Sequence, residues 1–378
     1  MHDFGGPPLD SDLPPRGTED AMKVIQKAIL SQGIQTPEEL EKFLNERLVG
    51  KPLDELAAEF AQQGPKTDLD RAEELLDGLD DDASTTEIRQ AANQALAITP
   101  YCISAWLMLG VHEPDATKAL EYFNQGIEKG RVRFDGLIEA LEEGQGIWGW
   151  IEARDFMRLL NNRALVLQDL GEFEQATQTY DEMLELNPGD NQGVRGDLLR
   201  LYMIHRRHND ARALLDRYPD DEDIAMAYGR ALLMFCETMV RSGYEMPDME
   251  EPGAPKSPPA LMKSLGPEFD LAKKHIRRAV KLNPFVPWMM THPQLMGVEL
   301  DETVSFGGPA EAVAYAQKWA LIWYAMGLPF VAMVAAMPSD PLRHAKGSMK
   351  RMEFLDLVGQ LESLDDVPWW EDFHSGMD

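Results

Sequence analysis

The stretch FMRLLNNRALVLQDLGEFEQATQTYDEMLELNP, residues 156–188, decides the fold of this chain. Apolar and small residues recur at helical spacing in both halves, at Leu160, Ala164, Leu167, Ala176, Tyr180, Met183 and Leu184. Gly171 lies where a first helix must stop, and Asn187-Pro188 ends a second one. We therefore predict two antiparallel helices joined by a tight turn. The two alanines let the backbones approach, and the tyrosine fills the space beside them.

Similar helix–turn–helix units recur along the chain with a period close to 34 residues, which is typical of the tetratricopeptide repeat (TPR). Ala176 and Ala211 lie 35 residues apart, and residues 105–110 carry the Trp-x-x-Leu-Gly spacing of a first repeat helix. Because one unit cannot bury its apolar face alone, its neighbours must stack on it. The sequence therefore predicts an all-α fold. We expect a TPR-like α-solenoid, a right-handed superhelix of helix hairpins with an N-terminal helical cap.

The composition along the chain divides it into six predicted segments. They are a disordered arm (1–17), a helical N-terminal cap (18–65), TPR-like repeats (66–242), a Pro-rich loop insert (243–266), C-terminal TPR-like helices (267–344), and a helix with an acidic tail (345–378). Within the repeats, we expect residues 130–150 to break the period after a helix over 116–129. Beyond Pro284, the residues Pro287 and Pro293 predict an irregular crossing.

The chain is strongly acidic, with 36 Lys and Arg against 65 Asp and Glu and a net charge of −29. This balance argues against partners with phosphate backbones or anionic lipid surfaces, so we expect no nucleic acid as partner. It would attract a basic partner, or it keeps an elongated protein soluble. The only two cysteines, Cys102 and Cys236, lie in apolar helical patterns and indicate neither a disulfide framework nor a zinc site. The N-terminus lacks the pattern of a signal peptide, and we expect a cytoplasmic location.

Residues 319–337, from Trp319 to Met337, form a run of 19 residues without charge, which raises the question of a membrane span. Gly327-Leu-Pro329 divides this run in the middle, and no basic cluster marks a cytoplasmic edge. A buried helix pair that closes the solenoid explains the same residues. We therefore expect no membrane span here.

Several strings are more specific than helical periodicity. GIWGWIEARDFMR at 146–158 precedes the central hairpin, NPGDNQGVR at 187–195 follows it, and further strings lie at 218–221, 227–231, 282–287 and 311–315. Over about residues 68–325 the chain resembles bacterial TPR proteins of the suppressor-of-tumorigenicity-seven-like kind. The resemblance implies a helical-repeat scaffold. The insert at 243–266 and the apolar run at 319–337 depart from that pattern.

The segment 148–163 carries the strongest candidate binding site. Arg154, Arg158 and Asn162 share one face at helical spacing, with Trp148 and Trp150 at its mouth. Arginine and tryptophan together suit an anionic or peptide ligand. The full set of predicted partner-binding residues is Trp148, Trp150, Arg154, Arg158, Asn162, Asn191 and Arg195. In the alternative interpretation, the tryptophans pack under residues 130–150 and the arginines form structural ion pairs with Glu139, Glu142, Glu143 and Glu152.

Catalytic, metal and cofactor sites are not indicated. His205 and His208 have helical metal-ligand spacing, but two arginines separate them and no carboxylate completes a site, so we expect a solvent-facing helix end. No nucleophile elbow, phosphate loop or dinucleotide motif occurs. We therefore predict no enzyme activity, no metal and no cofactor. The acidic tail with Trp369 and Trp370 either docks on a partner or covers the last repeat.

The sequence thus predicts a non-catalytic scaffold or adaptor that binds a segment of a protein partner on the concave face of a TPR superhelix. Two alternatives stay open. One is an acidic, chaperone-like holder of a basic partner, for which the net charge is the only support. The other is an enzyme or ligand sensor centred on residues 148–163.

Overall fold

The structure is a computed structural model that describes residues 66–80, 82–141, 144–243, 267–292, 300 and 306–338, together with Glu19, Met22, Lys23, Gln26 and Glu55. The predicted arm at 1–17, most of the predicted cap at 18–65, residues 244–266 of the insert and the tail at 345–378 lie outside the described residues. These parts of the sequence interpretation stay predictions.

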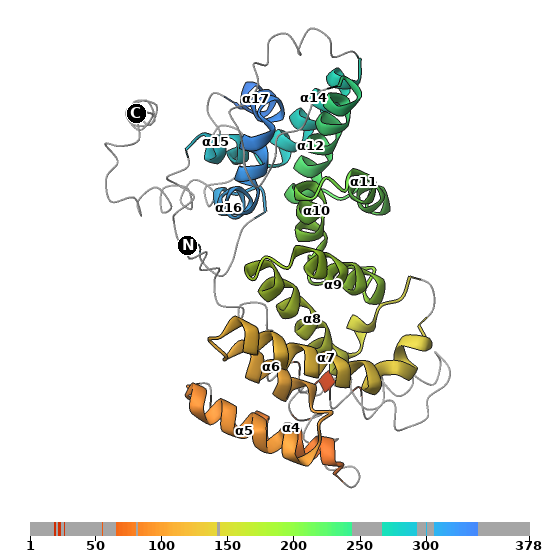
Figure 1. Ribbon diagram of the computed structural model, residues 1–378, viewed down its shortest axis with the longest axis vertical. Coiled ribbons are helices and arrows are strands. Elements are labelled where there is room, and N and C mark those ends of the chain that lie inside the picture. Colours follow the sequence, from red (N-terminus) through yellow and green to blue (C-terminus); the bar gives the residue numbers. More distant parts are fainter. Residues whose placement is uncertain are drawn as a thin grey trace, which may run out of the picture. The chain divides into compact units, whose positions relative to one another are not determined.

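The described part of the chain is entirely helical, with thirteen α-helices and one 3₁₀ turn, and it contains no strand (Figure 1). It divides into two compact units, Met1–Val194 and Arg195–Asp378. The boundary falls inside the range that the sequence analysis treated as one run of repeats. Helices of the first unit are α4 (Asp68–Asp77), α5 (Thr85–Ile98), α6 (Ile103–Val111), α7 (Ala116–Glu139), α8 (Ile151–Asp169) and α9 (Phe173–Leu186). Helices of the second are α10 (Arg195–Ile204), α11 (His208–Arg217), α12 (Ile224–Arg241), α14 (Pro267–Leu282), α15 (Phe285–Thr291), α16 (Pro309–Met326) and α17 (Leu328–Ala335).

The central hairpin forms as the sequence predicts. Helix α8 ends at Asp169 and α9 begins at Phe173, with Gly171 between them at a φ of 76°. This left-handed conformation suits glycine because it has no Cβ. Ala164, Ala176 and Tyr180 are fully buried, and Gln168 donates a hydrogen bond of 2.9 Å to the Tyr180 hydroxyl. The close packing of α8 on α9 is therefore confirmed.

Three helix pairs stack in the first unit: α4 with α5, α6 with α7, and α8 with α9. The first helices of these pairs, α4, α6 and α8, also contact one another in succession. Local signals place the helix starts, because Thr67 with Asp70 and Ser84 with Glu87 form capping boxes at α4 and α5. The stacked arrangement is the one that TPR units need to bury their apolar faces.

Helix α7 is longer than predicted. The sequence analysis ended it at residue 129, whereas it continues to Glu139, so residues 130–139 are helix and not an irregular insert. The reason lies in packing. Gly130 is buried, and its missing side chain leaves room for the ring of Phe156 on α8. Gly130 is therefore a position of close contact between α7 and α8.

In the second unit, α10 pairs with α11 and α12 pairs with α14, although the insert separates the latter two in sequence. Helices α12 and α14 thus form a pair whose members are separated in sequence by residues 242–266. The prediction of an irregular crossing at Pro287 is wrong, because α15 covers Phe285–Thr291. Pro287 falls in the first turn of this helix, where a missing N–H removes no helical hydrogen bond. Helix α16 contacts α10 and α12.

The apolar run at 319–337 forms the end of α16 and all of α17. These helices meet at Gly327, where the φ is 63°, and are bent by 115°. Within the ranges that the structure describes, no single helix is long and apolar enough to cross a membrane. By length and composition alone, this bent pair meets the requirement when its two helices are taken together. Trp319, Trp323 and Met326 are buried in the second unit.

Candidate functional site

The structure places five of the seven predicted partner-binding residues at the start of α8. Trp148 lies in the 3₁₀ turn Ile147–Gly149, and Trp150 is the N-cap residue of α8. Arg154, Arg158 and Asn162 follow on successive turns of that helix. All five are at least half-buried. These five residues therefore lie in or next to α8, and their role in binding a partner stays a prediction.

Asn191 and Arg195 are placed differently. Asn191 is an exposed residue of the turn after α9. Arg195 begins α10 in the second unit, where its guanidinium pairs with Asp221 and lies over the Tyr218 ring at 5.6 Å. The sequence analysis grouped Arg195 with the α8 residues because it follows the next turn. Asp221 and Tyr218 both belong to the second unit.

Arg154 and Arg158, here called the arginine pair, converge on one carboxylate. Arg154 Nη1 lies 2.9 Å from one oxygen of Glu19, and Arg158 Nη2 lies 2.8 Å from the other. The Glu19 side chain is only 13% exposed. Two charge-assisted hydrogen bonds to one partly buried carboxylate form a specific recognition geometry. The pair therefore forms a carboxylate-binding site, and within this chain the carboxylate is that of Glu19.

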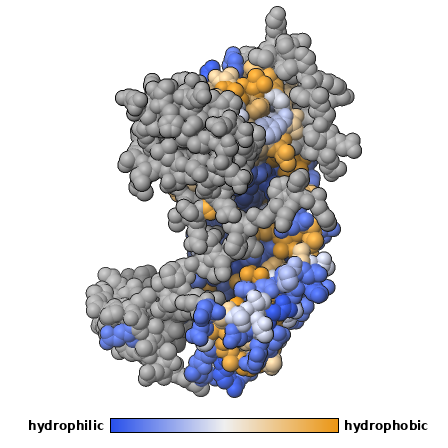
Figure 2. Space-filling view, turned by 90° about the vertical axis from the view of Figure 1, so that its left-hand side faces the viewer, coloured by the Kyte–Doolittle hydropathy of each residue, from blue (hydrophilic) through white to orange (hydrophobic). Residues whose placement is uncertain are grey.

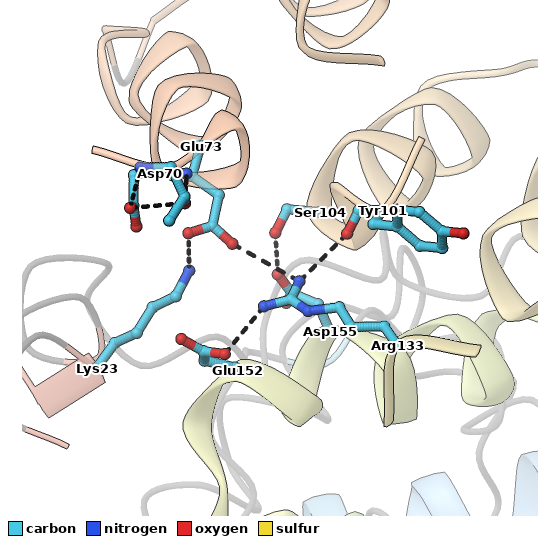
Figure 3. Close-up of polar contacts among 9 residues, drawn as sticks. Lys23, Asp70, Glu73, Tyr101, Ser104, Arg133, Glu152 and Asp155 are labelled. Atoms are coloured by element: carbon cyan, nitrogen blue, oxygen red, sulfur yellow. Dashed lines mark hydrogen bonds and ion pairs between the residues drawn. The ribbon is translucent and has the colours of Figure 1, made fainter. Parts of the chain in front are cut away.

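Other groups hold each arginine in place. Arg154 donates from Nε to the Trp148 carbonyl at 3.1 Å, and its guanidinium lies 5.2 Å from the Trp148 ring centroid. Arg158 Nη1 pairs with Asp155 at 2.7 Å. Asp155 in turn accepts a hydrogen bond from Ser104 of α6 (Figure 3). Since these contacts do not involve Glu19, the arginine pair is oriented by the repeats themselves.

Burial alone would raise the pKa of Asp155, but the charge of Arg158 and the hydrogen bonds from Ser104 and Arg158 outweigh it and hold that pKa below its ordinary value. A carboxyl whose pKa is lowered on folding contributes stability above its unfolded pKa, about 3.9. This contribution is lost as the pH falls through the lower folded value.

We therefore expect the stability difference between the wild type and an Asp155→Asn variant to depend on pH. The difference should be constant between about pH 5 and 7, and it should shrink as the pH falls below about 4, because the carboxyl of the unfolded wild type then becomes protonated while that of the folded protein stays ionised. Urea denaturation of both proteins across this range measures it. A difference that stays constant down to pH 3 would show that the ionised carboxylate contributes nothing.

Asn162 occupies the turn after Arg158. Its side-chain nitrogen donates to the Arg158 carbonyl at 2.8 Å. Its side-chain oxygen is buried and has no hydrogen-bond partner among the residues that the structure describes. Buried amide oxygens are ordinarily paired. The Asn162 amide thus bonds to the backbone of α8 through its nitrogen alone.

A second charged group, around Arg133, includes Glu152 in the first turn of α8 and was not predicted (Figure 3). Arg133 of α7 lies 3.0 Å from Glu152 and 3.8 Å from Glu73 of α4, and it donates to the Tyr101 carbonyl at 3.3 Å. Glu73 also pairs with Lys23 at 2.6 Å. The predicted pairing of the α8 arginines with Glu152 is thus replaced by pairing of Glu152 with Arg133. No local pattern marks these contacts, because they join residues far apart in sequence.

The two cysteines, the histidine pair and the possible metal ligands were the remaining candidates for chemistry in the described regions. Burial raises the pKa of Cys102 to about 11 and that of Cys236 to about 12, so both are neutral thiols at physiological pH. His205 lies in the turn after α10 and His208 begins α11, so the two histidines do not share one helix as their spacing suggests. Among the residues with described positions, no group of three or more His, Cys, Asp or Glu is arranged to hold a metal ion.

Comparison with known families supports the architecture. A family model described as tetratricopeptide repeat matches residues 167–234. This chain contains tetratricopeptide repeats. The TPR match covers the end of α8, the helices α9 to α11 and the first part of α12. Comparisons with curated proteins and with solved structures gave no match. TPR repeats generally mediate protein–protein interaction and are typically not catalytic.

Proposed function

We propose that this TPR protein is a non-catalytic interaction scaffold that binds a segment of a partner protein on the concave face of a right-handed superhelix. The binding surface in this proposal lies over the first helices of the first unit, around the arginine pair. The observation that carries the proposal is the convergence of Arg154 and Arg158 on a single carboxylate. Such a geometry recognises an acidic side chain of a peptide or helix.

The surroundings of the arginine pair suit a segment of protein better than an isolated small anion. Polar groups for further contacts lie on α4 and at the start of α8, where Glu73 and the Gly149 carbonyl each bind a side chain. On the face drawn in Figure 2, described hydrophobic and hydrophilic residues lie in alternating patches.

We also propose three more specific properties of this protein. They are membership of the bacterial suppressor-of-tumorigenicity-seven-like group, a cytoplasmic location and the absence of catalytic activity. The strings at 146–158 and 187–195 support the first. The two neutral, fully buried thiols support the last for cysteine chemistry. A chaperone-like holder of basic proteins is a weaker alternative, supported only by the net charge of −29.

The test begins with affinity capture from the source cell, identification of the captured protein by mass spectrometry, and its purification. Its dissociation constant is then measured for wild type, for Arg154→Glu/Arg158→Glu, and for Arg131→Glu. Arg131 is the matched control because it pairs with Glu182 and is 55% exposed, away from the arginine pair's contacts. We expect the double variant to bind at least tenfold more weakly and the control to bind like wild type, as removal of central charged contacts does in other interfaces.

Equal binding by all three proteins would refute a binding role for the arginine pair. High salt distinguishes the alternative, because a holder that binds basic proteins through net charge loses its partner as salt is raised and is insensitive to these two substitutions.

A further inference from the structure

The described residues near the N-terminus present three polar side chains at helical spacing. Glu19, Met22, Lys23 and Gln26 are helical, and positions separated by three, four and seven residues lie on one side of an α-helix. Glu19, Lys23 and Gln26 are half-buried, whereas Met22 is 43% exposed. Among the described residues of this segment, the half-buried side chains are therefore an acid, a base four residues on, and an amide three residues further.

Each of the three side chains has a complementary partner in the repeats. The Glu19 carboxylate binds the arginine pair. The Lys23 ammonium lies 2.6 Å from Glu73 Oε2 of α4. The Gln26 amide makes two hydrogen bonds, donating to the Gly149 carbonyl at 3.1 Å and accepting from the Ile151 N–H at 3.0 Å. The segment thus contacts two of the three first helices of its own unit.

The contact at Gln26 has a further consequence for α8. Ile151 is the first residue of this helix, and its N-cap residue Trp150 supplies no side-chain hydrogen bond. The first N–H groups of a helix need a partner from outside it. Gln26 therefore supplies the cap that the local sequence of α8 lacks. A ligand that replaces the segment must provide the same acceptor.

The contacts of Glu19, Lys23 and Gln26 are all polar, and polar contacts of this kind can be exchanged for those of another segment. Pairs of partly buried charges contribute little net stability, because desolvation offsets most of their attraction. Removal of one partner alone is unfavourable, since it leaves the other charge buried and unpaired. A surface of this kind is stable when covered by either of two segments with the same charge pattern, and unstable when bare.

We propose that the N-terminal segment is an internal competitor for the partner-binding surface, and that the partner is a helix with an acid, a base four residues later and an amide three residues after that. This inference rests on the proposed function, since it assigns the partner chemistry and the regulation of that same surface. The chain's own segment covers the arginine pair until a matching helix replaces it. Tethering favours the internal segment, because a linked ligand has an effective concentration in the millimolar range.

The probe is a fluorescent peptide with the sequence of residues 16–30, RGTEDAMKVIQKAIL. Fluorescence anisotropy measures its binding to the full-length wild type, to Glu19→Lys, and to Glu19→Lys combined with Arg154→Glu/Arg158→Glu. Reversal of the charge at position 19 places a cation against the arginine pair and releases the internal segment. We expect Glu19→Lys to bind the peptide at least tenfold more tightly than wild type, and the triple variant to lose that gain.

Two controls make the result specific. Asp20→Lys changes the net charge by the same amount at the next residue and is expected to leave peptide binding at the wild-type level. A peptide that itself carries Glu19→Lys is expected not to bind the Glu19→Lys protein, because its lysine would face Arg154 and Arg158. If Glu19→Lys binds the wild-type peptide no better than wild type does, or if the triple variant keeps the gain, the inference is overturned.

The purified partner separates this inference from the proposed function. We expect the partner to bind Glu19→Lys at least tenfold more tightly than wild type. Equal binding to these two proteins overturns the competitor role of the segment, while dependence on Arg154 and Arg158 would still support a scaffold that binds there. In another outcome, the peptide binds as expected while substitution of both arginines leaves the affinity for the partner unchanged. That combination would refute the proposed function at this surface.

Discussion

An Asn283→Asp substitution is expected to destabilise the second unit by roughly 3–5 kcal/mol, because it creates an unpaired charge in a buried network. Asn283 is fully buried between α14 and α15. Its side-chain nitrogen donates to the Gly308 carbonyl and to Glu311, each at 2.8 Å, and its oxygen accepts from the Phe285 N–H at 3.0 Å. One amide thus joins the ends of three helices.

The substitution preserves size and the acceptor for the Phe285 N–H, but it removes both donated hydrogen bonds. It also places a carboxylate beside that of Glu311. Hydrogen exchange of α14 and α16 measures the loss of stability locally. Addition of Glu311→Gln is the control, since it removes the repulsion and restores a donor, and it should recover at least about 1 kcal/mol. Equal exchange in wild type and Asn283→Asp would show that this network is not stabilising.

Substitution of two glycines of α7 is expected to give opposite results. Gly130→Ala should destabilise the first unit by about 1–3 kcal/mol, because a Cβ at this position would lie 2.3 Å from Cδ2 of Phe156. The Phe156 ring cannot move aside easily, since it is fully buried and packs on Phe134 with ring centroids 5.8 Å apart. The gain in helix propensity from alanine, roughly 1 kcal/mol, is smaller than the clash.

Gly136→Ala is the matched control on the same helix. A Cβ there meets no atom within 4 Å, and the residue is exposed, so only the helix propensity changes. We expect stabilisation by about 0.5–1 kcal/mol. Hydrogen exchange of α7 and α8 in both variants measures the difference. Stabilisation of similar size by both substitutions would contradict the packing of Phe156 against Gly130.

The helix hairpins of this protein are predictable because their information is local. Periodic apolar residues, Gly171 and Asn187-Pro188 fix α8 and α9 without reference to the rest of the chain. The end of α7 cannot be predicted locally, because the contact of Gly130 with Phe156 joins residues of two different helices. Pro287 predicts a break in the chain when its position in a helix is unknown. In the structure it lies in the first turn of α15, where proline is compatible with a helix.

The candidate site likewise has a part that local sequence predicts and a part that depends on long-range contacts. Helical spacing places Arg154, Arg158 and Asn162 on one helix, but it does not show what they bind. Glu19 lies 135 residues before Arg154, and no periodicity links the two positions. Arg195 was added to the site by its nearness in sequence, and its guanidinium binds Asp221 instead. Pairing over such separations is a property of the folded repeats.

The most direct test of a partner surface at the arginine pair is competition between the purified partner and the peptide of residues 16–30. The full-length Glu19→Lys protein is saturated with fluorescent peptide, and the partner is titrated in while anisotropy is recorded. We predict that the partner displaces the peptide completely, with an inhibition constant equal to its directly measured dissociation constant, because both ligands need Arg154 and Arg158. Formation of a ternary complex, with the peptide still bound at saturating partner, would contradict the account.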